Sequence, residues 1–318
     1  MKAHDFGILQ LLIFLFVVVI WLNLQTVDDT SCADCCTESV DASSLQRVAY
    51  STPLHGAANA DGDYSEGEKI QTKVVMFVPS PVPWEARRQH VHAQFEREGW
   101  NKSQAVLLFV FGNRSGDDLQ DTVNISVVQY PQAVNVVVNC RDYGDEWNKA
   151  DDSSGTTCKV YKSLKYIVAN YVAQYVWRGA DDSYVNLKYF FTFALPATRL
   201  YFGDLRTMNH LQPDLMLATQ PELAGLYGLR QFGQYMYGSG YVLSFDVADF
   251  VASLKIPPHL TWCEDVMIGM WLNPFQIEFR HSPLWTDRQY ASLGVDYILI
   301  HRMLPEHWAR LDGQGRLH

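Results

Sequence analysis

The sequence predicts an α/β fold in which a single, mostly parallel β-sheet is flanked by helices. The chain is 48% hydrophobic and 19% charged, which is typical of a folded domain and not of a disordered chain. Short β-branched runs alternate with helical patterns from residue 73 onward, as in parallel α/β sheets. Segment 73–318 is long enough for one large domain.

An apolar segment near the N-terminus, residues 7–24, approaches the length that crosses a bilayer. Lys2 precedes it, whereas Asp28 and Asp29 follow it, so we expect a cytoplasmic tail at 1–6, an uncleaved anchor at 7–24 and a lumenal remainder. A cleaved signal peptide is the alternative. It usually has a shorter apolar core and ends in a small-x-small cleavage site, and neither applies here.

Residues 25–72 are rich in Asp, Ser, Thr, Ala and Gly without a sustained period, which predicts a flexible stem. Its cysteines could bridge two copies of the chain or stay free or locally paired; they are Cys32, Cys35 and Cys36. Cys140 and Cys158 bracket a polar loop and could close it as a disulfide, and Cys263 suits a buried position. Sequons at Asn101, Asn113 and Asn124 also fit a lumenal domain.

The predicted domain then alternates its elements. Residues 74–78 form the first predicted strand, and a helix over 83–98 begins at Pro83 and ends at Gly99. Further strands are expected at 105–111, 123–128 and 134–138. A long helix is expected from Lys159 to about Tyr175, because apolar residues fall on one stripe at 160, 164, 167, 168, 171, 172 and 175.

The segment after that helix runs as a strand into an acidic turn at Asp181 and Asp182. Adjacent carboxylates at a strand end can coordinate a divalent cation and bridge it to a diphosphate. An ordinary turn or helix cap is the alternative that such a pair more often represents.

The formal net charge of −10 and the lack of a dense Lys/Arg run argue against a nucleic-acid partner.

Several motifs around this turn resemble glycosyltransferase family 31, the β1,3-glycosyltransferases, over about residues 73–310. The acidic motif reads Arg178-Gly-Ala-Asp-Asp-Ser-Tyr-Val-Asn, and two downstream segments match more closely: Tyr235-Met-Tyr-Gly-Ser-Gly-Tyr-Val-Leu-Ser and Glu264-Asp-Val-Met-Ile-Gly. Weaker matches are Arg87-Arg-Gln-His-Val-His-Ala-Gln-Phe and Phe109-Val-Phe-Gly. The closing segment Asp296-Tyr-Ile-Leu-Ile-His resembles the family's last strand.

The resemblance implies a GT-A type nucleotide-sugar-binding fold. It also implies an inverting enzyme that transfers a hexose, either galactose or N-acetylglucosamine, from a UDP-hexose to a glycan hydroxyl. Asp182 matches the family's metal ligand for Mn²⁺ or Mg²⁺, and Asp265 matches its general base. His301, which ends the segment that resembles the family's last strand, is the candidate for a second metal ligand, with His281 and His307 as competitors. A hydrogen-bonded histidine without a metal is the alternative. Helix capping is the alternative role of Asp265.

The remaining candidates are assigned on the same resemblance and on residue type. Donor-binding candidates are Asp181, Arg88, Lys162 and Arg178, although each cation could be a solvated surface charge. Sugar-pocket candidates are Gly238, Gly240, Tyr241 and Glu264. A tight turn is the alternative reason for the glycines, and helix capping for Glu264.

Departures from the family pattern leave room for other functions. Ala180 replaces the first Asp of the acidic triplet, while His92, Gln94 and Phe95 replace Arg, Thr and Trp. From the resemblance as a whole we expect a Golgi membrane hexosyltransferase. The alternative, which the Ala180 substitution favours, is a non-catalytic sugar-binding or chaperone-like relative of the same fold. An anchored hydrolase is disfavoured, because the chain has neither a Gly-x-Ser-x-Gly nor a His-Glu-x-x-His motif.

Overall fold

The computed structural model describes residues 68–81, 84–113, 133–141, 155–207, 233–254, 264–287, 291–292 and 295–311. The predicted tail, anchor, strand 123–128, stem cysteines and Cys263 lie outside these ranges, as does the stem up to residue 67. Within the described ranges, no helix has the length and apolar character that crossing a membrane requires.

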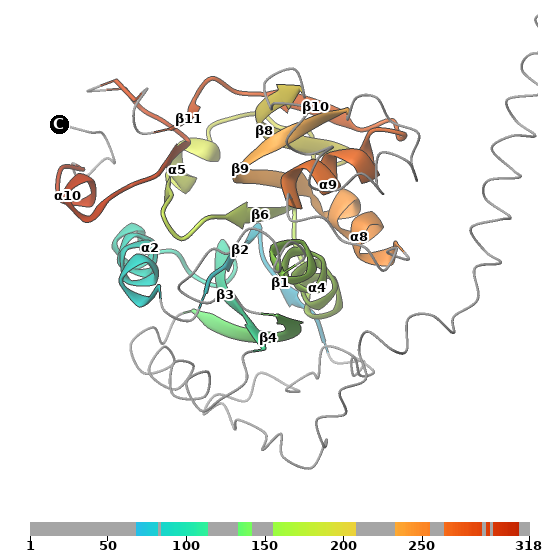
Figure 1. The fold of residues 1–318 in the computed structure, drawn as a ribbon, viewed down its shortest axis with the longest axis horizontal. Coiled ribbons are helices and arrows are strands. Elements are labelled where there is room, and N and C mark those ends of the chain that lie inside the picture. The colour runs from blue at the N-terminus through green and yellow to red at the C-terminus, as the bar shows by residue number, and fades with distance from the viewer. Residues whose placement is uncertain are drawn as a thin grey trace, which may run out of the picture. The chain divides into compact units, whose positions relative to one another are not determined.

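A seven-stranded sheet forms the centre of the fold, in the order β10-β8-β9-β6-β2-β3-β4 (Figure 1). All neighbours in it are parallel except β9, which runs antiparallel to both β6 and β8. The mostly parallel sheet of the prediction is thus confirmed. Its strands are β2 (Val74–Pro79), β3 (Ala105–Asn113), β4 (Val134–Arg141), β6 (Tyr175–Gly179), β8 (Leu200–Thr207), β9 (Gln234–Ser244) and β10 (Glu278–His281).

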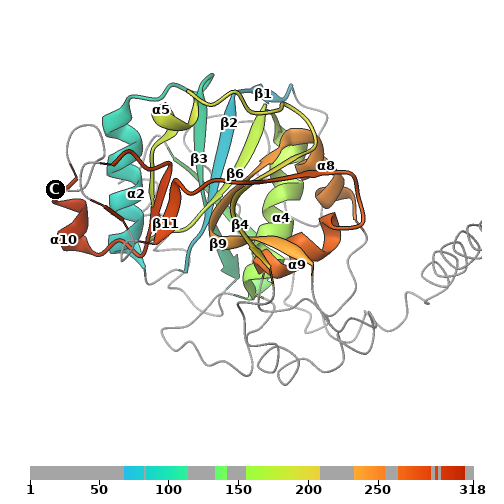
Figure 2. The same cartoon turned by 90° about the horizontal axis from the view of Figure 1, so that it is seen from above.

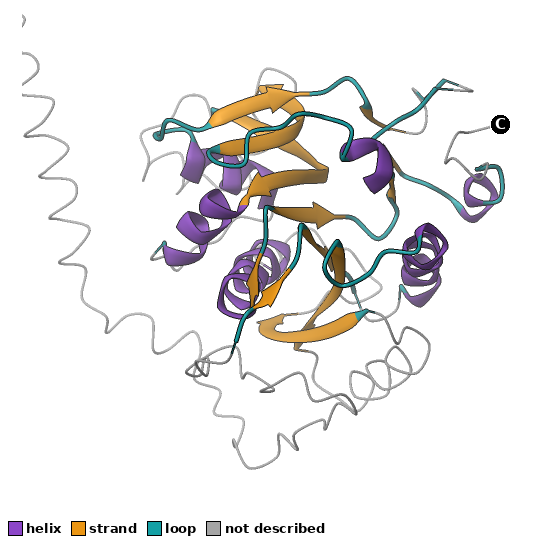
Figure 3. Cartoon of the chain, turned by 180° about the vertical axis from the view of Figure 1, so that it is seen from behind, coloured by secondary structure: helices purple, strands orange, loops and turns teal. Residues whose placement is uncertain are grey.

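Helices cover both faces of this sheet, as Figure 3 shows in purple against orange strands. Because side chains alternate along a strand, Val74 and Met76 of β2 face one core while Val75 and Phe77 face the other. The first core is covered by α2 (Glu85–Glu98) and α5 (Leu187–Phe190). The second is covered by α4 (Gly155–Asn170), α8 (Phe245–Ser253) and α9 (Glu264–Leu272).

The helix predicted from Lys159 to Tyr175 is wrong at both ends. Helix α4 already begins at Gly155 and stops at Asn170, after which Tyr171–Val172 forms strand β5 and Tyr175 opens β6. Tyr171 and Tyr175 continue the helical spacing by coincidence. Both side chains are buried as strand residues, since a strand of a two-sided core is apolar without a helical period.

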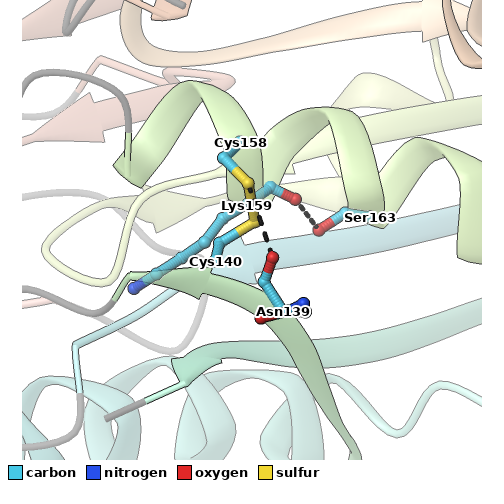
Figure 4. The surroundings of a disulfide bond; sticks show 5 residues. All are labelled: Asn139, Cys140, Cys158, Lys159 and Ser163. Carbon is cyan, nitrogen blue, oxygen red and sulfur yellow. Dashed lines mark hydrogen bonds between the residues drawn. A yellow bond between two sulfur atoms is a disulfide. The ribbon is translucent and has the colours of Figure 1, made fainter. Parts of the chain in front are cut away.

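The predicted disulfide is confirmed: Cys140 at the end of β4 bonds Cys158 in the first turns of α4 (Figure 4). The bond closes a loop with a sequence separation of 18 residues. In the next turn, Ser163 Oγ donates a 2.6 Å hydrogen bond to the Lys159 carbonyl. The disulfide therefore fixes the start of α4 against the edge strand of the sheet.

Two small sheets accompany the large one, which the prediction of a single sheet did not include. Strand β1 (Ile70–Gln71) pairs with β5, and β12 (Leu299–His301) pairs with both β11 (Trp285–Asp287) and β7 (Tyr184–Val185). Helix α10 (Pro305–Trp308) follows β12. Strands of two or three residues are too short to show a period in the sequence, so pattern analysis passes over them.

Candidate active site

The acidic turn lies at the carboxyl end of the central strands, where open α/β sheets commonly bind ligands. Asp181 and Asp182 follow β6, and Ser80 follows the parallel neighbour β2. Strand β9 brings Gly240 opposite Gly179. Ser183 Oγ donates a 3.0 Å hydrogen bond to the Ser239 carbonyl, which ties the acidic turn to β9.

Asp181 is buried beneath the turn. Its Oδ2 accepts a 2.9 Å hydrogen bond from Ser80 Oγ, and its Oδ1 lies 3.5 Å from an Arg87 guanidinium nitrogen. Burial, assisted by the neighbouring charge of Asp182, raises the pKa of Asp181 to about 6. We conclude that Asp181 supports the turn from within and leaves the more exposed position to Asp182.

Two basic residues of α2 take different positions at this turn. Arg88 is fully buried, and one of its guanidinium nitrogens donates to Ser80 Oγ at 3.1 Å and to the Pro81 carbonyl at 2.6 Å. Arg87 is half exposed and approaches both Asp181 and Asp182. Arg88, predicted to contact the donor, is thus committed to holding the end of β2, whereas Arg87 reaches the acidic turn.

Asp182 and His301 meet although 119 positions separate them in the sequence, since 301 − 182 = 119. Asp182 Oδ1 lies 3.4 Å from His301 Nε2, and Asp287 Oδ1 lies 2.7 Å from His301 Nδ1. Strand pairing explains the second contact, because Asp287 of β11 sits directly opposite His301 of β12. The result is a carboxylate–imidazole–carboxylate row.

The pKa values along this row follow from its contacts. Burial alone would lower the pKa of His301, but its hydrogen bonds to the Asp182 and Asp287 carboxylates outweigh burial and raise the pKa above its usual value. For Asp182, burial would raise the pKa, but the contact with His301 outweighs burial, so the pKa of Asp182 is lowered. The His301 hydrogen bond is also the largest cause of a lowered pKa at Asp287. Without a cation, the row favours a charged imidazolium between two carboxylates.

The same row fits half of a divalent-metal site. Asp182 Oδ1 and His301 Nε2 are 3.4 Å apart, and this distance is near the spacing of about 3 Å between adjacent ligand atoms of an octahedral ion. Asp287 on Nδ1 turns Nε2 toward Asp182, which is how a second carboxylate orients a metal-binding histidine. In the part of the chain that the structure describes, no third His, Cys, Asp or Glu completes a ligand set. A bound ion would depend on diphosphate oxygens and water for its other positions.

The two competing histidines lie elsewhere. His281 of β10 sits 3.7 Å from Asp204 and accepts a 3.2 Å hydrogen bond from the Leu205 amide. His307 of α10 accepts one from the Leu304 amide at 3.2 Å. Of the three histidines considered from the sequence, His301 is therefore the one that contacts Asp182.

Asp265 stands in the first turn of α9 and faces β9. Its Oδ2 accepts a 2.8 Å hydrogen bond from the Gly238 amide, and its Oδ1 accepts one of 2.9 Å from the Val266 amide. Burial raises the pKa of Asp265 despite these two donors. A carboxylate with a raised pKa and a fixed orientation suits proton abstraction, whereas the Val266 contact also fits the capping alternative.

Arg178, Glu264 and Tyr241 form a buried cluster behind Asp265. Arg178 pairs with Glu264 at 2.8 Å and also donates to the Gly238 carbonyl, while Tyr241 Oη donates to Glu264 at 2.9 Å. These residues were predicted to contact donor or sugar. Their described partners are protein groups, so the cluster positions Gly238 and the start of α9.

Lys162, another predicted donor-binding residue, lies on α4, in the layer opposite α2.

The glycines of β9 are required by neighbouring protein atoms. A Cβ at Gly240 would lie 2.7 Å from Leu299 Cδ1 and 3.1 Å from the Arg178 carbonyl, and φ there is 149°. A Cβ at Gly238 would lie 3.0 Å from Asp265 Oδ2. Close packing against β12 and against Asp265 is thus a reason for glycine at both positions, and the approach of a sugar to Gly238 and Gly240 stays a prediction.

Four residues of the site were not singled out from the sequence: Ser80, Arg87, Tyr237 and Asp287. Ser80 had a usable signal, because it ends the strand next to the acidic strand. Tyr237 lies beside the site, with its ring centroid 5.9 Å from that of His301 and its hydroxyl 3.2 Å from an Arg302 nitrogen. Asp287 follows no recognisable pattern, since its role depends on pairing between two three-residue strands.

Comparison with known proteins identifies the family of the chain. The model of the galactosyltransferase family matches residues 86–283, more than half of the chain. The chain belongs to the galactosyltransferase family. Among curated members, mouse beta-1,3-galactosyltransferase 6 is 26% identical over 163 residues, which are 49% of each chain. The chain thus spans about half the length of this curated relative.

Solved glycosyltransferase structures resemble the chain more distantly than this relative of the galactosyltransferase family. A mannosyltransferase from Pyrobaculum calidifontis, in complex with GDP-mannose and Mn²⁺, has 9% identity and a TM-score of 0.42, covering 79% of this chain and 64% of its own. The galactosyltransferase LgtC, with donor and acceptor sugar analogues, has 11% identity and a TM-score of 0.41, covering 73% and 87%.

Proposed function

We propose that this galactosyltransferase-family chain is an inverting hexosyltransferase that moves galactose or N-acetylglucosamine from a UDP-sugar to a glycan hydroxyl, forming a β1,3 linkage. One observation carries the proposal: β9 is hydrogen-bonded to both parts of the site. Ser239 is bonded to the acidic turn that carries Asp182, the partner of His301, and the neighbouring Gly238 is bonded to Asp265. Family membership supports a GT-A type assignment of the sheet.

In the proposed mechanism, each residue has one task. Asp265 accepts the proton of the attacking acceptor hydroxyl, while the Gly238 and Val266 amides hold its carboxylate in place. Asp182 and His301 would hold Mn²⁺ or Mg²⁺, and Asp287 orients the imidazole. A bound divalent cation supplies positive charge where the UDP leaving group develops negative charge. Arg87 is placed to add to that charge.

The test combines turnover with binding. Purified full-length chain in detergent is incubated with Mn²⁺, a panel of UDP-sugars and glycan acceptors, and UDP release is measured. Mn²⁺-dependent UDP binding should be lost with a chelator and in Asp182→Ala, because an open site with few protein ligands depends on each of them. Unchanged metal-dependent binding in Asp182→Ala, in a protein that melts like the wild type, would remove Asp182 from the site.

A non-catalytic sugar-binding relative is the second candidate. Ala180 in place of a third carboxylate favours it, together with the absence of a third metal-type ligand among the residues with described positions. The same panel separates the two candidates. A chain that binds UDP with Mn²⁺ but transfers no sugar to any acceptor is the non-catalytic relative.

We also propose that the chain is a single-pass type II protein of the Golgi membrane, with its stem cysteines available for a homodimer. The apolar segment 7–24 and the sequons support this placement. Asn101 of the described sequon is exposed, and its side-chain oxygen accepts hydrogen bonds from Ser103 N and Oγ. Glycosidase treatment should lower the apparent mass, and carbonate washing should leave the chain in membranes. A freely soluble chain without a mass shift would refute this placement.

A further inference from the structure

A hollow of about 550 Å³ lies at the amino ends of the central strands. Three of its lining residues, Lys73, Gln104 and Gln174, directly precede β2, β3 and the first residue of β6. These strands are parallel, and their carboxyl ends carry the acidic turn. The hollow is therefore at the opposite end of the sheet from the transfer site, the end at which Figure 2 shows β1 and α5.

Aromatic rings provide much of its apolar surface. Trp100, Phe191 and Phe193 line it with partly exposed side chains. The Trp100 and Phe191 rings meet edge to face, with centroids 5.5 Å apart. Phe190, which is buried, also lines it. Such rings offer flat apolar faces in a fixed orientation, at little cost in side-chain entropy on binding.

The charge of the hollow is positive, although the whole chain has a formal charge of −10. Lys73 and Lys188 line it, and no Asp or Glu does. Both lysines are exposed, and neither forms an ion pair with any residue of the described ranges. Lys73 Nζ lies 6.0 Å from the Phe191 ring centroid. Burial raises the pKa of nearby Glu98, and hydrogen bonds from Gln94 and Trp100 oppose this rise more than the charge of Lys188 does.

Two side-chain amides complete the lining. Gln174 Nε2 donates a 3.2 Å hydrogen bond to Tyr175 Oη, and Gln104 Oε1 accepts one of 3.4 Å from the Asn101 amide. Each amide keeps further donor and acceptor capacity for hydroxyl groups. We propose that this hollow is a second carbohydrate-binding site, which takes a saccharide bearing carboxylate or sulfate groups. The choice of a saccharide over other anions rests on the proposed function, since a glycan-modifying enzyme meets such chains.

Each part of the lining has a matching part in this ligand. The ammonium groups of Lys73 and Lys188 pair with the anionic substituents, and the aromatic faces pack on the C–H faces of the sugar rings. The glutamine amides bond ring hydroxyls. Because the site is remote from Asp265, it binds a part of the glycan other than the reacting hydroxyl, or a separate chain.

Binding of a chondroitin sulfate hexasaccharide to the full-length chain in detergent tests the proposal, with neutral chitohexaose as the comparison. We expect the sulfated ligand to bind at least tenfold more tightly and its affinity to fall with added salt. Lys73→Ala/Lys188→Ala should lose at least tenfold. Lys102→Ala is the matched control, because Lys102 is an exposed lysine near Trp100 that does not line the hollow. It should bind like the wild type.

Several outcomes would overturn the proposal: no binding, equal binding of both hexasaccharides, or unchanged affinity in the double variant. Displacement by UDP with Mn²⁺ would also do so, because it would place the saccharide at the transfer site. Transfer to a neutral acceptor should survive in the double variant. If the chain binds the hexasaccharide but transfers no sugar, only the proposed function is contradicted. If the chain is active but does not bind the hexasaccharide, only the present inference is contradicted.

Discussion

Asp265 is held by two backbone amides, so its substitution separates proton transfer from capping. Asp265→Asn keeps the size of the side chain and one acceptor oxygen, but can no longer take a proton. We expect turnover to fall by about 10² to 10⁴, with UDP binding retained, because the proposed mechanism places this residue against the acceptor and not against the diphosphate. Initial rates and UDP titrations on the same preparation measure both. Wild-type turnover in Asp265→Asn would show that the residue only caps α9.

Glu264, its neighbour, is expected to make the stability of the fold depend on pH. Burial raises the pKa of Glu264 to about 7, against the opposing effect of Arg178. The folded state then binds more protons than the unfolded state between about pH 4.5 and 7. The stabilisation is complete below this window and is lost as pH rises through it, by up to about 3 kcal/mol. Urea unfolding across this range should show the decline.

Glu264→Gln provides the comparison for that measurement. Gln resembles the protonated form of Glu264, which the folded state favours below about pH 7. The free energy of unfolding of the variant should therefore decline less steeply than that of the wild type between about pH 4.5 and 7. Equal slopes in the two proteins would show that Glu264 titrates alike in the folded and unfolded states.

At the scale of elements, β9 packs closely against β12 and β6 at Gly240. Gly240→Ala should lower the free energy of unfolding by about 2–4 kcal/mol, because its Cβ meets Leu299 and the Arg178 carbonyl at an unfavourable φ. Gly99→Ala is the matched control. It also has a positive φ, 69°, at the end of α2, but nothing lies within 4 Å of its Cβ, so about 1 kcal/mol is expected. Equal losses would show that packing at β12 contributes nothing.

The elements also differ in how far the sequence predicts them. Strands β2 and β3 were predictable because both are buried on two faces and read as apolar runs. Helix α2 was predictable from Gly99, which adopts the left-handed conformation at its end. The end of α4 was not, since apolar strand residues continued its spacing. Strands β7 and β11 are too short to show a period, so the contact of Asp287 with His301 was missed with them. Strand β12 was expected only from its resemblance to the last strand of the family.

At the scale of the whole molecule, the Cys140–Cys158 bond links an edge strand to a helix of one face. A chain-entropy estimate for a loop of this length gives about 3 kcal/mol of stabilisation. Cys140→Ser/Cys158→Ser should therefore unfold at lower urea concentration, with a change of about that size. Wild-type protein treated with a reductant should match it. A variant as stable as the untreated wild type would show that the sheet and helices hold this edge unaided.

Strand β12 is encoded downstream of every strand of the seven-stranded sheet, and this order matters during synthesis. A ribosome that has passed β10 has supplied the entire sheet and Asp182, but not yet His301. Premature stop codons between residues 283 and 299 would thus encode chains that keep every strand of the large sheet and lack the histidine. Such alleles would abolish the proposed metal pair even where quality control tolerates the shortened product.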